Sequence, residues 1–155
     1  MNKTLENKWN LYFHDYMDSN WNRESYEKLS EINNIVDFWT IFNVMKDKLS
    51  LGMFFLMKNN IFPKWDDNQN MTMSYLSMKI LKTSAQEFME SILIGLLSET
   101  ICKSNPSLIN GISISPKKNF CICKIWINTT EEYAKDKHLY ELPENYHGDV
   151  VFNNF

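Results

Sequence analysis

The sequence predicts an α+β fold in which a curved antiparallel sheet carries three helices on its convex face. Several short segments alternate apolar and polar residues, which is typical of half-buried strands. Three other segments combine a capping pattern with residues suited to an amphipathic helix. A hairpin over residues 111–128 favours antiparallel pairing. Helices stacked on one face of such a sheet would leave its other, concave face free to hold a ligand.

The strands and helices follow one another along a single domain without repeats or an internal linker. Alternation places Trp9, Leu11 and Phe13 on one face of the first strand. The expected elements are strands over 8–14 and 26–32, a helix from 35 to 45, strands over 52–57 and 71–80, a helix from 85 to about 99, hairpin strands over 111–115 and 120–128, a helix from 129 that ends before Pro143, and a strand over 149–154.

Capping residues predict where the three helices begin. Asn34 is expected to cap the first helix, with Asp37 favoured at its positive end. Ser84 and Glu87 form a capping-box pattern before the second helix. The Thr129–Glu132 stretch has a similar pattern and predicts the third.

Composition limits the classes of function. The chain has 155 residues and a net charge of -3, so it is not a general polyanion binder, and any nucleic-acid contact must be local. The longest apolar run, residues 92–97, is too short to span a bilayer, and no secretory signal follows Met1, so we expect a soluble protein.

The three cysteines, Cys102, Cys121 and Cys123, fit neither a disulfide framework nor a zinc site. In a strand, Cys121 and Cys123 point to the same face, where we expect small core residues. Unpaired thiols favour a reducing compartment, the cytoplasm or the nucleus.

The loop over residues 61–70 carries the most unusual pattern in the chain. Pro63 favours a turn, and Trp65 is followed at once by Asp66 and Asp67. An indole face beside a carboxylate suits a flat, cationic ligand with N–H donors on its edge, such as a charged purine. The alternative is that Trp65 closes the end of the core beneath a solvated turn.

Two further tryptophans, Trp21 and Trp126, fall where a core does not require them. Two indoles on separate loops could sandwich one base, which is worth about 1–3 kcal/mol per base, and a positive charge on the base adds about 0.5–2 kcal/mol. The lysines of the hairpin, Lys117, Lys118 and Lys124, could neutralise a short phosphate chain.

Four segments together resemble the eukaryotic translation initiation factor 4E family of mRNA cap-binding proteins. The opening strand NKWNLYF, the helix start Ile35–Trp39, the loop Pro63–Asp66 and the spacing from Gly111 to Trp126 match the aromatic pattern of that family. The resemblance extends along almost the whole chain, although much of the remaining sequence has diverged.

The resemblance implies a role for each site residue. Trp21 and Trp65 correspond to the indoles that sandwich 7-methylguanine, and Trp126 to the indole that faces the N7-methyl group. Asp66 takes the position of a glutamate that accepts the guanine N1 and N2 hydrogens; it is one methylene shorter, so the base sits closer or Asp67 helps. Lys117 falls on a phosphate-binding arginine, and Lys124 substitutes for a second basic residue that is shifted along the strand.

The resemblance also implies a second surface, on the helices. The family binds partner proteins that carry a Tyr-x-x-x-x-Leu-apolar helix, and the matching residues here are Ile35, Trp39, Met89, Glu90 and Leu93. Helical spacing alone would place Trp39 in the core, whereas the family match makes it a partly exposed anchor.

The sequence contains no nucleophile–base pair, metal-binding cluster or phosphate-binding glycine loop, so we expect a binding protein rather than an enzyme, without a cofactor. The expected function is that a monomer binds the 7-methylguanosine cap of mRNA and recruits a scaffold protein for translation initiation. The alternative is a diverged homologue that has lost cap binding and acts as a decoy or regulator of scaffold proteins.

Overall fold

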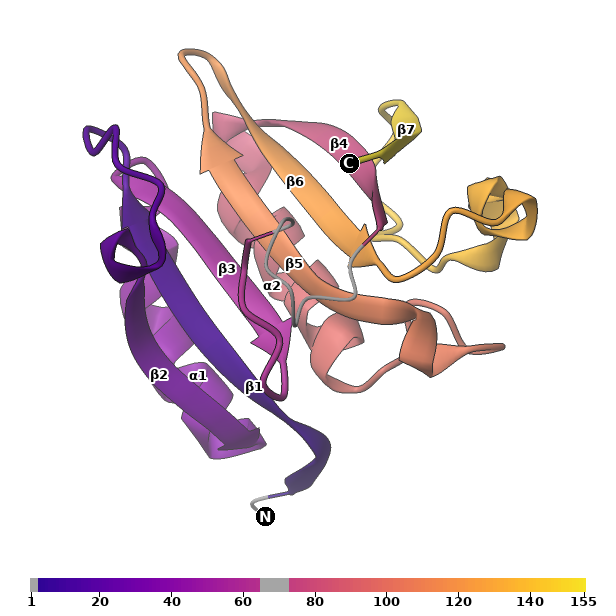
Figure 1. Ribbon diagram of the computed structural model, residues 1–155, viewed down its shortest axis with the longest axis horizontal. Coiled ribbons are helices and arrows are strands. Elements are labelled where there is room, and N and C mark those ends of the chain that lie inside the picture. Colours follow the sequence, from indigo (N-terminus) through magenta and orange to yellow (C-terminus); the bar gives the residue numbers. More distant parts are fainter. Residues whose placement is uncertain (1–2, 65–72) are drawn as a thin grey trace.

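A computed structural model describes residues 3–64 and 73–155. One sheet runs through this part of the chain in the strand order β2-β1-β3-β5-β6-β4-β7, with every neighbouring pair antiparallel (Figure 1). The strands are β1 (Thr4–Asp15), β2 (Glu27–Asn34), β3 (Gly52–Lys58), β4 (Ser74–Leu81), β5 (Ile109–Pro116), β6 (Phe120–Ile127) and β7 (Val150–Asn154). The helices are α1 (Ile35–Met45) and α2 (Ala85–Leu97).

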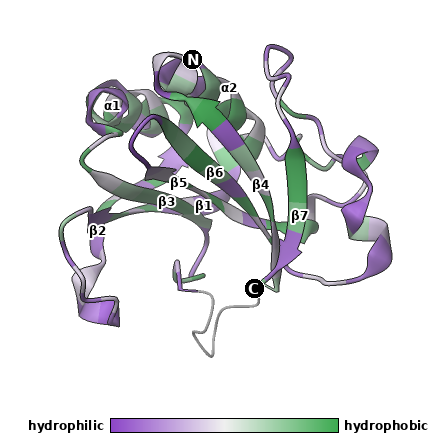
Figure 2. Ribbon diagram, turned by 90° about the horizontal axis from the view of Figure 1, so that it is seen from above, coloured by the Kyte–Doolittle hydropathy of each residue, from purple (hydrophilic) through white to green (hydrophobic). Residues whose placement is uncertain are grey.

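Both helices lie on the same side of the sheet, and the main core lies between them and the strands (Figure 2). Alternation along the strands sends Leu11, Ile112 and Ile125 into this core. Cys121 and Cys123 are buried beside them as free thiols, as predicted. The α+β class and the antiparallel sheet are therefore confirmed.

The cap of α1 forms as the sequence predicts. The Asn34 side chain accepts a hydrogen bond from the backbone N–H of Asp37 at 2.8 Å. The Asp37 carboxylate accepts in turn from the backbone N–H of Asn33 at 3.0 Å. Two backbone donors at the start of the helix are thus satisfied reciprocally.

The capping box predicted for α2 does not form, although the helix does. Ser84 has helical backbone angles and its side chain makes no capping hydrogen bond. The reason is that a 3₁₀ turn, Lys82–Ser84, leads directly into α2, so Ser84 does not have the extended backbone that a capping side chain needs.

The prediction of a third helix is wrong. Two short 3₁₀ turns, Glu132–Lys135 and Lys137–Leu139, occupy that segment. Between them the Asp136 carboxylate accepts from the backbone N–H of His138 at 3.0 Å, which starts a new turn instead of continuing a helix. Ala134 is the one fully buried residue within these turns, and Leu139 is partly buried against the core, so the apolar surface that would hold a longer helix against the sheet is small.

No helix in residues 3–64 or 73–155 is long and apolar enough to cross a membrane.

Candidate functional site

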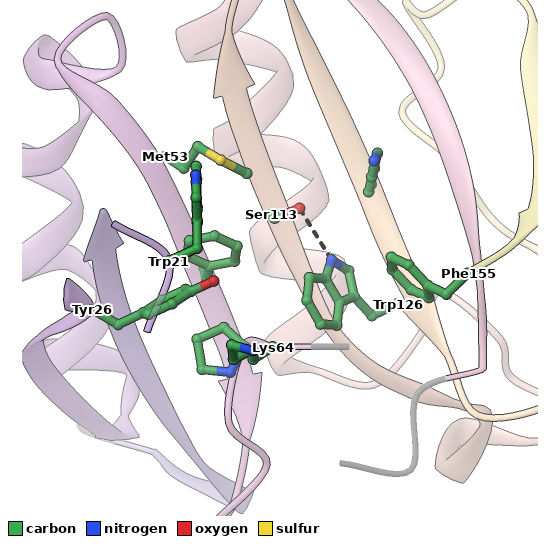
Figure 3. Close-up of a pocket in the computed structure, with 10 residues that line it drawn as sticks. Trp21, Tyr26, Met53, Lys64, Ser113, Trp126 and Phe155 are labelled. Carbon is green, nitrogen blue, oxygen red and sulfur yellow. Dashed lines mark hydrogen bonds between the residues drawn. The ribbon is translucent and has the colours of Figure 1, made fainter. Parts of the chain in front are cut away.

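A cavity of about 300 Å³ opens on the face of the sheet opposite the helices (Figure 3). Its walls are largely aromatic, with a few polar groups, which is the usual make-up of a small-molecule site. The lining residues are Trp21, Tyr26, Met53, Phe55, Pro63, Lys64, Ser113, Lys124, Trp126 and Phe155.

Trp21 forms one wall and comes from the loop between β1 and β2. Its side chain is 45% exposed. The imidazole of His14 covers one side of the indole, with the ring centroids 3.6 Å apart and the planes within 2° of parallel. Tyr26 meets both rings edge-on. A base could stack on the indole face opposite His14.

Trp126 forms the facing wall and is 4% exposed. Its indole Nε1 donates a hydrogen bond to the Ser113 hydroxyl at 3.0 Å, from β6 to β5. Phe55 packs edge-on against it, and Phe155 packs beside it with ring centroids 5.2 Å apart. These contacts fix the orientation of Trp126, as Figure 3 shows for Ser113 and Phe155.

Two lysines, Lys64 and Lys124, line the cavity. The Lys124 ammonium lies 4.4 Å from the ring centroid of Tyr75, and the side chain is half-buried. Burial lowers the pKa of Lys124, and the positive charge of Lys117 lowers it further. Two lysines that affect each other in this way can share one polyanionic group. Lys118 is exposed in the turn between β5 and β6.

Trp65, Asp66 and Asp67 lie outside the described residues, so their predicted roles stay predictions. Pro63 and Lys64, which precede them directly, line the cavity. Among the other predicted site residues, the cavity brings together Trp21, Trp126 and Lys124.

The sequence-based prediction missed four aromatic or apolar lining residues. Alternation in β3 was sufficient to find two of them, because Met53 and Phe55 must face away from the core side chains of Phe54 and Leu56. Tyr26 and Phe155 gave no comparable signal. Phe155 reaches the cavity because β7 pairs with β4, a long-range contact.

The predicted partner surface on the helices is only partly exposed. Ile35, Trp39 and Glu90 are half-buried and keep some accessible surface. Met89 and Leu93 are buried in the core, at 2% and 3% exposure, so they offer a partner almost no surface. On α2 the exposed apolar side chain is instead Ile94, one position after Leu93. A shift of one position moves a helical side chain by about 100° around the axis.

In the part of the chain that the structure describes, no group of three or more His, Cys, Asp or Glu side chains is arranged to hold a metal ion.

Comparisons with known proteins agree with this architecture. The family model described as "Eukaryotic initiation factor 4E" matches residues 4–146. A mouse protein, eukaryotic translation initiation factor 4E type 1B, is 32% identical over 69 residues, which cover 43% of this chain and 28% of the mouse protein. The match therefore spans less than a third of that relative.

Solved structures share the fold at low identity. Ascaris suum eIF4E-3, solved with the m7G cap, superimposes with a TM-score of 0.74 at 17% identity, covering 85% of this chain and 77% of that one. Caenorhabditis elegans eIF4E-3, solved with the 4E-binding protein Mextli and a cap analogue, gives a TM-score of 0.74 at 16% identity over 84% and 76%. The family model covers most of the sequence, from the start of β1 to residue 146, shortly before β7. The chain therefore belongs to the eukaryotic initiation factor 4E family.

Proposed function

We propose that this protein binds the 7-methylguanosine 5′ cap of mRNA in the cavity on the concave face of the sheet. The observation that carries the proposal is the pairing of an exposed indole, Trp21, with a half-buried lysine, Lys124, in one aromatic cavity. The protein acts in the cytoplasm as a reader of the cap, without catalysis and without a cofactor.

The aromatic part of the cavity suits the methylated base. Methylation at N7 makes guanine cationic, and a cationic ring is attracted to the electron-rich face of an indole. Trp21 offers that face, and the buried indole of Trp126 limits how far the base can enter. Trp65 is proposed to cover the second face of the base, and Asp66 to accept its edge hydrogens, as the family resemblance implies.

The lysines suit the triphosphate. Lys124 lies at the cavity and is close enough to Lys117 for their charges to interact, so a phosphate chain would reduce the repulsion between them. Lys118, exposed at the same hairpin, adds to the local positive potential in a chain whose net charge is negative.

Calorimetric titration with 7-methyl-GTP and with GTP tests the proposal. The wild-type protein should bind the methylated nucleotide more tightly, and Trp21→Ala should weaken that binding about 5- to 150-fold, the equivalent of one stacked base. Trp39→Ala, on the helical side, is the matched control and should leave the affinity unchanged. Equal affinity of the wild type for GTP and 7-methyl-GTP would contradict the proposal.

The helical side is proposed to bind a scaffold protein through a Tyr-x-x-x-x-Leu-apolar helix. Trp39 supports this, because its indole is only half-buried against Phe38 and Phe42 and keeps accessible surface for a partner side chain. Val36 on α1 and Ile94 on α2 are further exposed apolar residues on the helices.

A further inference from the structure

His14 is buried beneath Trp21, the more exposed of the two described indoles that line the cavity. It belongs to β1 and has no exposed surface. Its ring lies parallel to Trp21 at 3.6 Å between centroids. Two parallel rings at this separation are in van der Waals contact, so the plane of one constrains the plane of the other.

Two backbone carbonyl oxygens contact the ring nitrogens of the His14 imidazole. Nε2 lies 2.6 Å from the carbonyl oxygen of Asn20, and Nδ1 lies 3.0 Å from that of Asp15. A carbonyl can only accept, so each contact is a hydrogen bond when that ring nitrogen carries a proton. The neutral ring can make one of these bonds and the doubly protonated ring can make both. In either state the ring is anchored at an edge.

The loop that carries Trp21 has mostly local bonds of its own. Side chains of Asp15, Asp18 and Asn20 each accept from the backbone N–H two residues further on, at 2.8, 2.8 and 2.9 Å. Such turns shape the loop but do not fix it to the sheet. The contact from His14 to Asn20 connects β1 with the residue directly before Trp21.

We propose that His14 is the positioning residue of Trp21. Its ring forms the back layer of the stack and holds the indole plane toward the cavity before any ligand arrives. The inference rests on the proposed function only where it concerns ligand affinity. Preorganisation of this kind improves affinity because the indole does not have to be ordered during binding.

Three substitutions separate the ring from the hydrogen bond. His14→Phe keeps a flat ring beneath Trp21 and removes the bond to Asn20, whereas His14→Gln keeps an N–H donor without a ring. His14→Ala removes both. The ring is expected to dominate: Phe should retain affinity for 7-methyl-GTP, whereas Gln and Ala should each lose about 2- to 12-fold, the equivalent of one aromatic pair.

The order of Trp21 is measured in the ligand-free protein by NMR of its indole N–H, assigned with Trp21→Phe. We expect His14→Ala and His14→Gln to shift and narrow this signal as the indole becomes mobile, and His14→Phe to retain the rigid state. The other indole signals report whether each variant is folded. An indole that stays equally ordered in His14→Ala would overturn the proposal, as would binding that survives in Gln and is lost in Phe.

The two proposals fail in different ways. If the wild-type protein does not bind 7-methyl-GTP, the cap-binding proposal fails, while the ligand-free NMR comparison still decides whether His14 orders Trp21. If the wild type binds and all three variants bind equally well, cap binding stands and the positioning role is refuted.

Discussion

The hydrogen bond between Trp126 and Ser113 determines how a buried indole faces the cavity. Both residues are almost fully buried, so the Ser113 hydroxyl takes the place of water as the acceptor for Nε1. Ser113→Ala would leave that N–H without its acceptor and should lower the free energy of unfolding by about 1–3 kcal/mol. We expect weaker binding of 7-methyl-GTP as well, because Trp126 loses its fixed orientation. Urea unfolding and calorimetry measure the two effects.

Ser115→Ala is the matched control for this change. Ser115 lies two residues further along β5, on the same face of the strand, and is more exposed. It should leave both the unfolding free energy and the affinity near the wild-type values. Equal losses in the two variants would mean that serine on this face matters for a reason other than the Trp126 bond.

At Lys124, stability and the proposed binding of phosphate oppose each other. Burial, together with the charge of Lys117, lowers its pKa in the folded protein. Between the folded and the unfolded pKa the unfolded chain binds more protons, so the contribution of this group to stability rises with pH through that window. Below that window the lysine is charged in both states, and the cost of holding its charge in the folded protein is fully present.

Lys124→Met should therefore slightly raise the melting temperature at a pH below that window and weaken the binding of 7-methyl-GTP about 10- to 150-fold, the equivalent of one charge-assisted hydrogen bond. Binding of the nucleoside 7-methylguanosine, which has no phosphate, should hardly change. Lys48→Met, an exposed lysine in the turn after α1, is the control for loss of one charge. A lower melting temperature for Lys124→Met together with unchanged 7-methyl-GTP affinity would mean that Lys124 stabilises the fold and does not bind phosphate.

At the residue level, the sequence directed attention to residue types that are out of place. Trp21, an indole on a loop, is exposed and lines the cavity. Trp126 also lines the cavity, but it is buried in a small cluster with Phe55 and Met57, so the prediction that a core does not require it is wrong. His14 was not identified, because its role depends on a stack and on two carbonyl contacts that arise only when the loop folds back on β1. Contacts of this kind, between a side chain and the backbone atoms of a folded loop, produce no periodic pattern in the sequence.

Among the secondary-structure elements, the two helix starts show that a capping pattern has to match the backbone before it. Asn34 has extended backbone angles and forms its bond to Asp37, whereas Ser84 continues a 3₁₀ turn and forms none. Asn34→Ala should therefore lower the free energy of unfolding by about 0.5–2 kcal/mol. Ser84→Ala should change it little. Urea unfolding of the two variants checks this contrast, and an equal loss would contradict it.

The segment after β6 shows why its helix could not be predicted reliably. The Thr129–Glu132 pattern suits a helix start, but most stabilisation of a helix in a protein comes from packing an apolar face. In the two 3₁₀ turns that replace it, Ala134 packs inward and Tyr133 is exposed. The Tyr140 hydroxyl instead donates to the carbonyl of Ala134 at 2.6 Å and holds these turns together.

Across the whole molecule, the sheet separates the two faces that are proposed to bind ligands. Both helices lie on one side of the sheet (Figure 2), together with the main core. The cavity and the smaller cluster of Phe55, Met57 and Trp126 lie on the other side. The sequence could predict this division, because alternation along each strand assigns side chains to opposite faces. It could not predict how far Met89 and Leu93 are buried, since one residue of register on a helix decides between core and surface.

This separation predicts that the two faces can be disabled independently. Trp21→Ala should lose 7-methyl-GTP binding and retain binding of a synthetic peptide with the Tyr-x-x-x-x-Leu-apolar motif. Trp39→Ala should do the reverse, because its indole packs on α1 and the core rather than on the cavity. Calorimetry with both ligands on both variants checks the prediction, with melting temperatures as the control for folding. If the wild type binds the peptide but not the cap, the alternative function as a decoy or regulator replaces cap binding. If each variant loses both ligands, the two faces do not act independently.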